Sequence, residues 1–98
     1  MQYLEEIFDA TKELVLQIAQ ELSGTVEMKP FREEAGVLFC EIVSPSASAE
    51  AFGMLQRLRG RLDEKEAEGT FPVKIVTENR IDRHEDGAAL EISLTDRV

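Results

Sequence analysis

The single histidine of the chain, His84, lies in the charged run DRHED at 82–86. One imidazole and two carboxylates can bind a divalent metal ion, and a histidine can act as a general acid or base. The spacing argues against both roles, because neighbouring turn residues point in different directions and the sequence has no second histidine. Polar residues are also the ordinary content of a hairpin loop. We therefore expect neither a metal site nor a catalytic centre at His84.

Cys40 is the only cysteine, so the chain can form no intramolecular disulfide and no multi-cysteine metal site. A nucleophilic cysteine needs a nearby base, but Cys40 stands between Phe39 and Glu41 in a run that we expect to be a buried strand. This setting favours an unreactive thiol in the core. A lone cysteine also fits a reducing compartment.

Serine and arginine side chains give no stronger signal of catalysis. The serines at 44, 46 and 48 lack a Gly-x-Ser-x-Gly motif and suit the capping of a helix instead. The arginines at 57, 59 and 61 are followed by acidic residues, a pattern typical of a solvated helix face. The sequence has no glycine-rich phosphate loop. We expect no enzyme activity, no cofactor and no bound metal.

The charge balance disfavours whole classes of partner. The 98 residues include 20 acidic and 11 basic side chains, which give a formal net charge of -9. This is the wrong sign for holding a phosphate backbone or an anionic membrane surface. No apolar run approaches the roughly 20 residues of a spanning helix, and the N-terminus lacks the pattern of a signal peptide. We expect a soluble protein, cytoplasmic as written, without direct contact with nucleic acid or membrane.

Two stretches have the apolar spacing of amphipathic helices. Between Leu4 and Leu22 apolar residues recur three and four positions apart, and Gly24 follows where a left-handed residue commonly ends a helix. The second stretch ends at the glycine and proline of EGTFP, 68–72. Its apolar side carries Phe52, Leu55, Leu58 and Leu62.

Four further stretches have the pattern of strands. Residues 25–31, 73–78 and 88–95 alternate between apolar and polar side chains, and 37–43 is apolar except at Glu41, as in a strand shielded on both faces. The turn sequences REEAG and HEDG connect these stretches into two hairpins. The predicted order is helix, strand, strand, helix, strand, strand.

This order predicts a single α+β domain over residues 1–98. Its most economical packing is a two-layer sandwich, in which a four-stranded antiparallel sheet carries both helices on one face. In the second strand, Leu38, Cys40 and Ile42 form an uninterrupted apolar set, so we expect them to face the helices. A slip of one residue would reverse this assignment.

The other face of the second strand would then expose apolar side chains to water. Such a patch favours a covering partner, and we predict an interface formed by Phe31, Val37, Phe39, Glu41 and Val43. The partner would be a second copy of the chain or a different protein. Two alternatives stay open: a loop or terminus covers the patch, or single apolar residues simply tolerate water.

Two long stretches resemble a known family. The first is GVLFCEIVSPSASAEAFGMLQRLRGRL, in which Phe52, Leu55 and Leu58 match a Phe-x-x-Leu-x-x-Leu helix after a strand and a short turn; the second is the hairpin FPVKIVTENRIDRHEDGAALEISL. They resemble the periplasmic domains of the PilN and PilO type of pilus-assembly proteins and their GspL and GspM counterparts in type II secretion. The resemblance implies a circularly permuted ferredoxin-like fold and a non-enzymatic assembly module that forms homodimers or heterodimers.

The family normally has a membrane helix before this domain, and the sequence begins directly with the first predicted helix. The chain would be periplasmic if it is an excised domain of a membrane-anchored protein, which would fit the lack of a capping residue before Leu4. The leading hypothesis is therefore an interaction or assembly module that docks through a sheet face or an edge strand. The alternative is a small acidic inhibitor or adaptor that occupies the nucleic-acid-binding groove of a partner protein.

Overall fold

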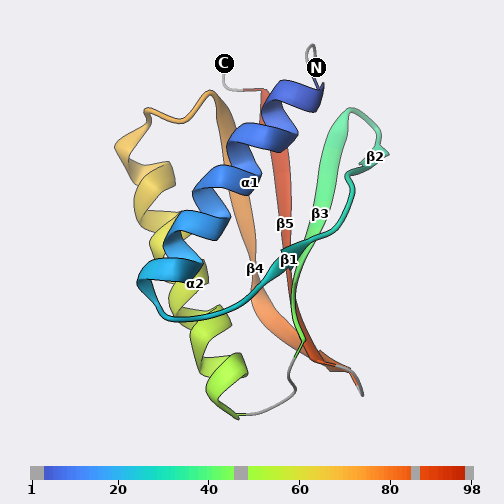
Figure 1. Ribbon diagram of the computed structural model, residues 1–98. Coiled ribbons are helices and arrows are strands. Elements are labelled where there is room, and N and C mark those ends of the chain that lie inside the picture. The colour runs from blue at the N-terminus through green and yellow to red at the C-terminus, as the bar shows by residue number, and fades with distance from the viewer. Residues whose placement is uncertain (1–3, 46–48, 85–86, 97–98) are drawn as a thin grey trace.

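The computed structural model describes residues 4–45, 49–84 and 87–96. Within them the chain forms two helices and five strands, in an order that begins as predicted with a helix and a hairpin (Figure 1). The elements are α1 (Leu4–Glu21), β1 (Glu27–Met28), β2 (Arg32–Glu34), β3 (Val37–Ser44), α2 (Ala49–Glu68), β4 (Val73–His84) and β5 (Gly87–Asp96).

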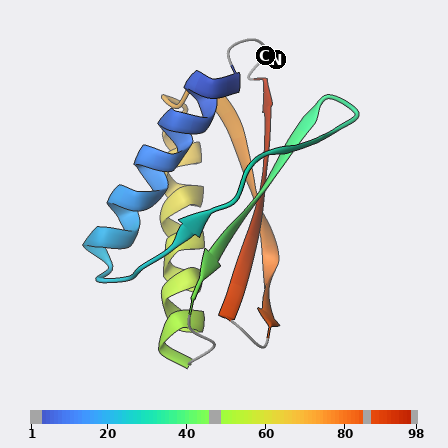
Figure 2. The ribbon, with the colours of Figure 1, turned by 45° about the vertical axis from the view of Figure 1, so that its right-hand side comes forward.

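The strands form one antiparallel sheet, and both helices lie on the same side of it (Figure 2). The strand order is β1-β3-β5-β4, with β2 also paired to β3. This arrangement confirms the predicted α+β class and is compatible with the predicted two-layer sandwich. The pairing of β3 with β5 places the two most buried strands at the centre, so β4 forms one edge and β1 with β2 the other.

The number of strands differs from the predicted four, because the expected strand at 25–31 is divided. The β1 segment pairs with one end of β3 and the β2 segment with the other end. The Lys29 N–H still donates to the Glu41 carbonyl oxygen (2.9 Å), but Pro30 has no N–H to continue the ladder. The chain therefore leaves β3 at Pro30 and rejoins it at Arg32.

The turn between β2 and β3 fixes how these two strands align. The two residues between them, Ala35 and Gly36, have positive φ angles of 52° and 80°. Positive φ at both positions is what a type I′ two-residue hairpin turn requires. The resulting register sets Arg32 opposite Phe39 and Glu34 opposite Val37.

The core lies between the helices and the sheet, and its β3 members are those predicted. Leu38, Cys40 and Ile42 are at most 2% exposed, whereas the residues between them are only half-buried. The prediction that Leu38, Cys40 and Ile42 face the helices is therefore confirmed. The members of this core in the helices and in β5 are Val15, Ile18, Ala19, Met54, Leu55, Leu58, Leu62, Ala88, Leu90, Ile92 and Leu94.

The end of α1 differs in one detail from the prediction. Ser23, not Gly24, takes the left-handed conformation, with a φ of 57°. The Gly24 N–H donates to the Ala19 carbonyl oxygen (2.8 Å) and the Ser23 N–H to that of Gln20 (3.0 Å), the bonds of a Schellman motif. The small size of Gly24 serves packing, because a Cβ there would stand 2.5 Å from Cγ of Met54.

Candidate functional site

The face of the sheet opposite the helices is the strongest candidate for a functional surface. In the described part of the chain no helix covers it (Figure 2). We call it the open face and define it by the strand positions that alternate with the buried ones. Its residues are Glu27, Arg32, Glu34, Val37, Phe39, Glu41, Val43, Lys74, Val76, Asp82, Glu91, Ser93 and Thr95, together with Lys29, which continues the pairing of β1 opposite Glu41.

An aromatic and aliphatic row crosses the middle of the open face. The register aligns Arg32, Phe39, Ser93 and Val76 across four strands. Val76 is 49% exposed, which makes it the most exposed of the large apolar side chains in the described residues. Phe39 and Val76 stand on either side of the small Ser93, so another apolar side chain could pack between them.

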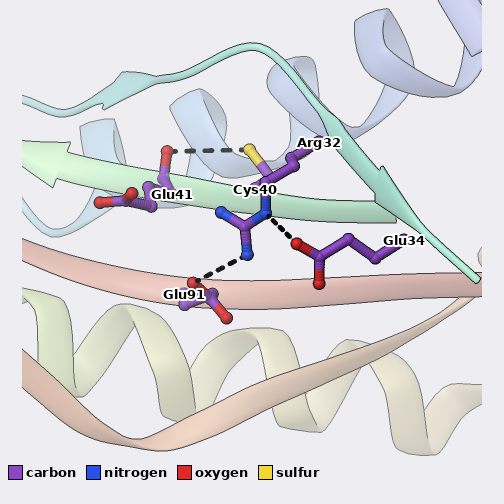
Figure 3. A network of polar contacts seen from close by, with 5 residues as sticks. All are labelled: Arg32, Glu34, Cys40, Glu41 and Glu91. Atoms are coloured by element: carbon purple, nitrogen blue, oxygen red, sulfur yellow. Dashed lines mark hydrogen bonds and ion pairs between the residues drawn. The ribbon is translucent and has the colours of Figure 1, made fainter. Parts of the chain in front are cut away.

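Arg32 lies over the ring of Phe39. Its guanidinium carbon is 5.2 Å from the ring centroid, within the range of a cation–π contact. The same guanidinium pairs with Glu34 through Nε (3.0 Å) and with Glu91 through Nη2 (3.8 Å), as Figure 3 shows. One cation thus covers an aromatic ring and links β2 to β5 above β3. These contacts are partly exposed, so each contributes little to stability.

Two carboxylates stand side by side next to this row. Glu41 of β3 and Glu91 of β5 are directly opposite each other in the sheet, and both are half-buried (Figure 3). Like charges in this position destabilise a sheet by up to about 1 kcal/mol. Among the described residues Arg32 pairs with Glu91, and no cation pairs with Glu41. Lys29 lies opposite Glu41 at the edge of the sheet but pairs with Glu27 (3.6 Å), so Glu41 has no ion pair beside Phe39 in the described part of the chain.

The structure brings together four of the five predicted interface residues. Val37, Phe39, Glu41 and Val43 all lie on the open face and are half-buried. Phe31 lies elsewhere: its ring meets that of Phe8 in α1 edge to face, with 5.0 Å between the centroids, and packs against the core. The break at Pro30 explains this placement, because Phe31 is outside the ladder and its side chain is free of the strand alternation.

Among the open-face residues that reasoning from the sequence missed, Val76 and Arg32 matter most. Val76 could have been found, since the alternation of Val73, Ile75 and Thr77 implies that a valine between them faces the other side. Arg32 could not, because its surroundings in the sequence are typical of a turn. Its place over Phe39 depends on the pairing of β2 with β3.

The two edges of the sheet are less suited to docking than its open face. At β4 the Ile75 N–H donates to Oε2 of Glu66 in α2 (2.9 Å), and the Thr77 hydroxyl donates to Oδ1 of Asp63 (2.7 Å). An irregularity in register between Thr77 and Ile81 interrupts the same strand. The opposite edge is short and broken at Pro30. Such features are the usual protection against strand addition.

The residues considered for catalysis do not form a site in the described part of the chain. The side chain of His84 and the serines at 46 and 48 lie outside the described residues. No group of three or more metal-ligating side chains occurs among the others. Of the arginine cluster, Arg61 pairs with Glu21 (2.6 Å) and with Glu64 (3.8 Å) at the surface.

Cys40 has the environment of a core thiol. Its Sγ is 3.2 Å from the Lys29 carbonyl oxygen, to which the S–H donates. Burial, and to a smaller extent the charge of Glu41, raise the pKa of the thiol from 9.0 to about 12. The reactive thiolate is therefore almost absent near neutral pH.

We expect a maleimide to leave Cys40 unlabelled in the native protein at pH 8 and to label it rapidly in urea.

Stability should also depend on this thiol at alkaline pH. Because the folded pKa is the higher one, its stabilising contribution is complete below pH 9 and is lost as the pH rises toward 12. The difference in unfolding free energy between the native protein and Cys40→Ala, measured from pH 7 to 11, checks this trend. A difference that grows with pH would contradict it.

Comparisons of the chain with protein-family models and with curated proteins give no match. In the described residues, neither α1 nor α2 combines the length and the apolar character needed to cross a membrane. The geometry of the open face is therefore the basis for assigning a function.

Proposed function

We propose that this protein is a non-enzymatic interaction module that docks another polypeptide through the open face of its sheet. The observation that supports this most directly is the row through Phe39 and Val76, which lies on the side of the sheet opposite both helices. Apolar side chains that are gathered on one face commonly mark a site of protein interaction. Docking would remove Val76 and the half-buried Val37 and Val43 from water.

The features of the two edges also favour docking on the face. Glu66 occupies a main-chain donor of β4, and Pro30 removes one from the opposite edge. A partner that added a strand would have to displace these groups or tolerate a missing hydrogen bond. A partner on the open face meets side chains only, so no hydrogen bond of the sheet is lost.

The resemblance to the PilN, PilO, GspL and GspM domains extends this proposal. In that case the chain would be a circularly permuted ferredoxin-like assembly component that pairs with a second copy or a related subunit. The helix and hairpin pattern of the two halves supports this reading. The proposal of docking through the open face does not depend on this family.

Photo-cross-linking tests the proposal. A benzophenone amino acid is placed at Val76 on the open face, or at Leu16 on α1 as a control, since the two side chains are similarly exposed at 49% and 40%. After irradiation of cells that naturally make the protein, we expect a discrete adduct from position 76 and none from position 16. The mass of the adduct tells a second copy from another protein. No adduct from position 76, or equal adducts from both, would contradict the proposal.

A further inference from the structure

We propose that the partner of the open face is a cationic polypeptide segment that sets an arginine against Glu41 and Glu91 and an apolar side chain against Phe39 and Val76. This inference rests on the proposed function and specifies the chemistry of the partner. It begins from the pair of carboxylates. Glu41 and Glu91 are opposite each other at the centre of the sheet, and Glu41 has no cationic partner among the described residues.

The charge of the whole open face points to the same kind of partner. Its charged side chains are the three cations Lys29, Arg32 and Lys74 and the five carboxylates Glu27, Glu34, Glu41, Asp82 and Glu91. Asp82 is paired with Arg80 in the irregular part of β4 (3.0 Å), and Arg32 is paired with Glu34 and Glu91. Glu27 is paired with Lys29 (3.6 Å), so Glu41, next to Phe39, is the carboxylate of the open face that has no ion pair among the described residues.

The net charge of the chain argues against a second copy as the occupant. Two chains that each carry -9 repel each other, and a dimer would bring two acidic faces together. A cationic partner is attracted by the same charges. Electrostatic complementarity of this kind speeds association and excludes partners of the wrong sign.

Arg32 shows how this surface holds a guanidinium group. It stacks on Phe39 and pairs with Glu91, so an aromatic ring and a carboxylate act together on one cation (Figure 3). A guanidinium is planar, so it can pair bidentately with a carboxylate and stack flat on an aromatic ring, whereas the lysine ammonium is a compact, strongly hydrated point charge. An arginine of the partner placed over Glu41 could pair with Glu41 and Glu91 together and relieve the repulsion between the two carboxylates.

The test is an NMR titration of the ¹⁵N-labelled protein with two short peptides of defined sequence. One alternates arginine with valine, and the other carries glutamate in place of each arginine. We expect saturable shifts of the amide signals of Phe39, Glu41, Glu91 and Ser93 with the arginine peptide and none with the glutamate peptide. Shifts confined to the helices, or no binding of the arginine peptide up to about 1 mM, would overturn the inference.

Variants separate recognition at the face from general attraction between charges. Glu41→Lys should weaken binding of the arginine peptide by about tenfold or more, and the nearly isosteric Glu41→Gln should weaken it less, which guards against a folding defect in the first variant. Glu13→Lys changes the net charge equally but lies exposed on α1, so it should change the affinity by less than about twofold. Equal weakening by Glu41→Lys and Glu13→Lys would overturn the inference.

The two proposals fail in different ways. If Val76 cross-links to a partner but the arginine peptide does not bind, then the chemistry assigned to the partner is wrong and docking through the open face stands. If Val76 yields no cross-link, the proposed function itself is wrong.

Discussion

Gly87→Ala is expected to destabilise the folded protein by about 3 kcal/mol or more, which is a large part of the roughly 5–15 kcal/mol typical of a domain. A Cβ at Gly87 would overlap the carbonyl oxygen of Ser44 and stand 3.2 Å from its carbonyl carbon. Gly87 also has a φ of 156°, which L side chains rarely adopt. Urea unfolding of the two proteins measures the difference.

Side-chain movements cannot relieve this clash, because the atoms that the added Cβ would meet belong to the backbone of a central strand. Ser44 is 3% exposed and pairs with Ala88, the residue next to Gly87. Gly60→Ala is the matched control: Gly60 lies within α2, and a Cβ added there would meet nothing within 4 Å, so this change should stabilise the protein by about 0.5–1 kcal/mol. A Gly87→Ala protein as stable as the wild type would contradict the packing of β3 against the β4–β5 hairpin.

Leu58→Ala should cost about 3 kcal/mol through the loss of buried surface and the cavity that remains. Leu58 is fully buried on the side of α2 that faces the sheet. For a domain of this size the melting temperature should fall by about 15 °C. Calorimetry or urea unfolding provides the measurement.

Leu16→Ala removes the same atoms from an exposed position and is the control for Leu58→Ala. Leu16 is 40% exposed on α1, so its truncation should cost less than about 1 kcal/mol. If the two substitutions were equally costly, α2 would not be the helix that seals the core, and the side of the sheet taken as open would be in doubt.

The class of fold and the inner face of β3 could be predicted from periodicity alone. Leu38, Cys40 and Ile42 are all apolar, so this face of the strand is the one that can turn toward the core. The opposite orientation would bury Glu41. The helices were equally predictable, since their apolar spacing extends over many turns. These signals are local and repeat often enough to outweigh individual exceptions.

In the sheet, the predictions that failed concern interruptions of a strand. Pro30 divides the first expected strand into β1 and β2, and the lack of an N–H at proline was sufficient reason to expect this. Once the ladder is broken, alternation no longer decides where the next side chain points. Phe31 therefore packs on Phe8 and not beside Phe39. The register irregularity between Thr77 and Ile81 could not be predicted in this way, because that segment contains no glycine or proline.

The candidate site was predictable only in part, for a related reason. Strand periodicity placed Phe39, Glu41, Val37 and Val43 on one face, but it gives no information on which residues of other strands lie beside them. The contacts of Arg32 with Phe39 and Glu91 join the β2–β3 hairpin to β5, which is distant in the sequence. Such contacts depend on register between strands, which the two-residue turn at Ala35 and Gly36 helps to fix.

The most direct test of docking through the open face is the rate at which a maleimide labels Val76→Cys. The buried thiol of Cys40 should not compete, so the engineered cysteine is the reactive one. We expect rapid labelling in dilute purified protein and labelling slowed by about tenfold or more in extracts of cells that naturally make the protein. Leu16→Cys should be labelled at the same rate in both. Equal rates for Val76→Cys in both settings, or protection of Leu16→Cys instead, would contradict docking through the open face.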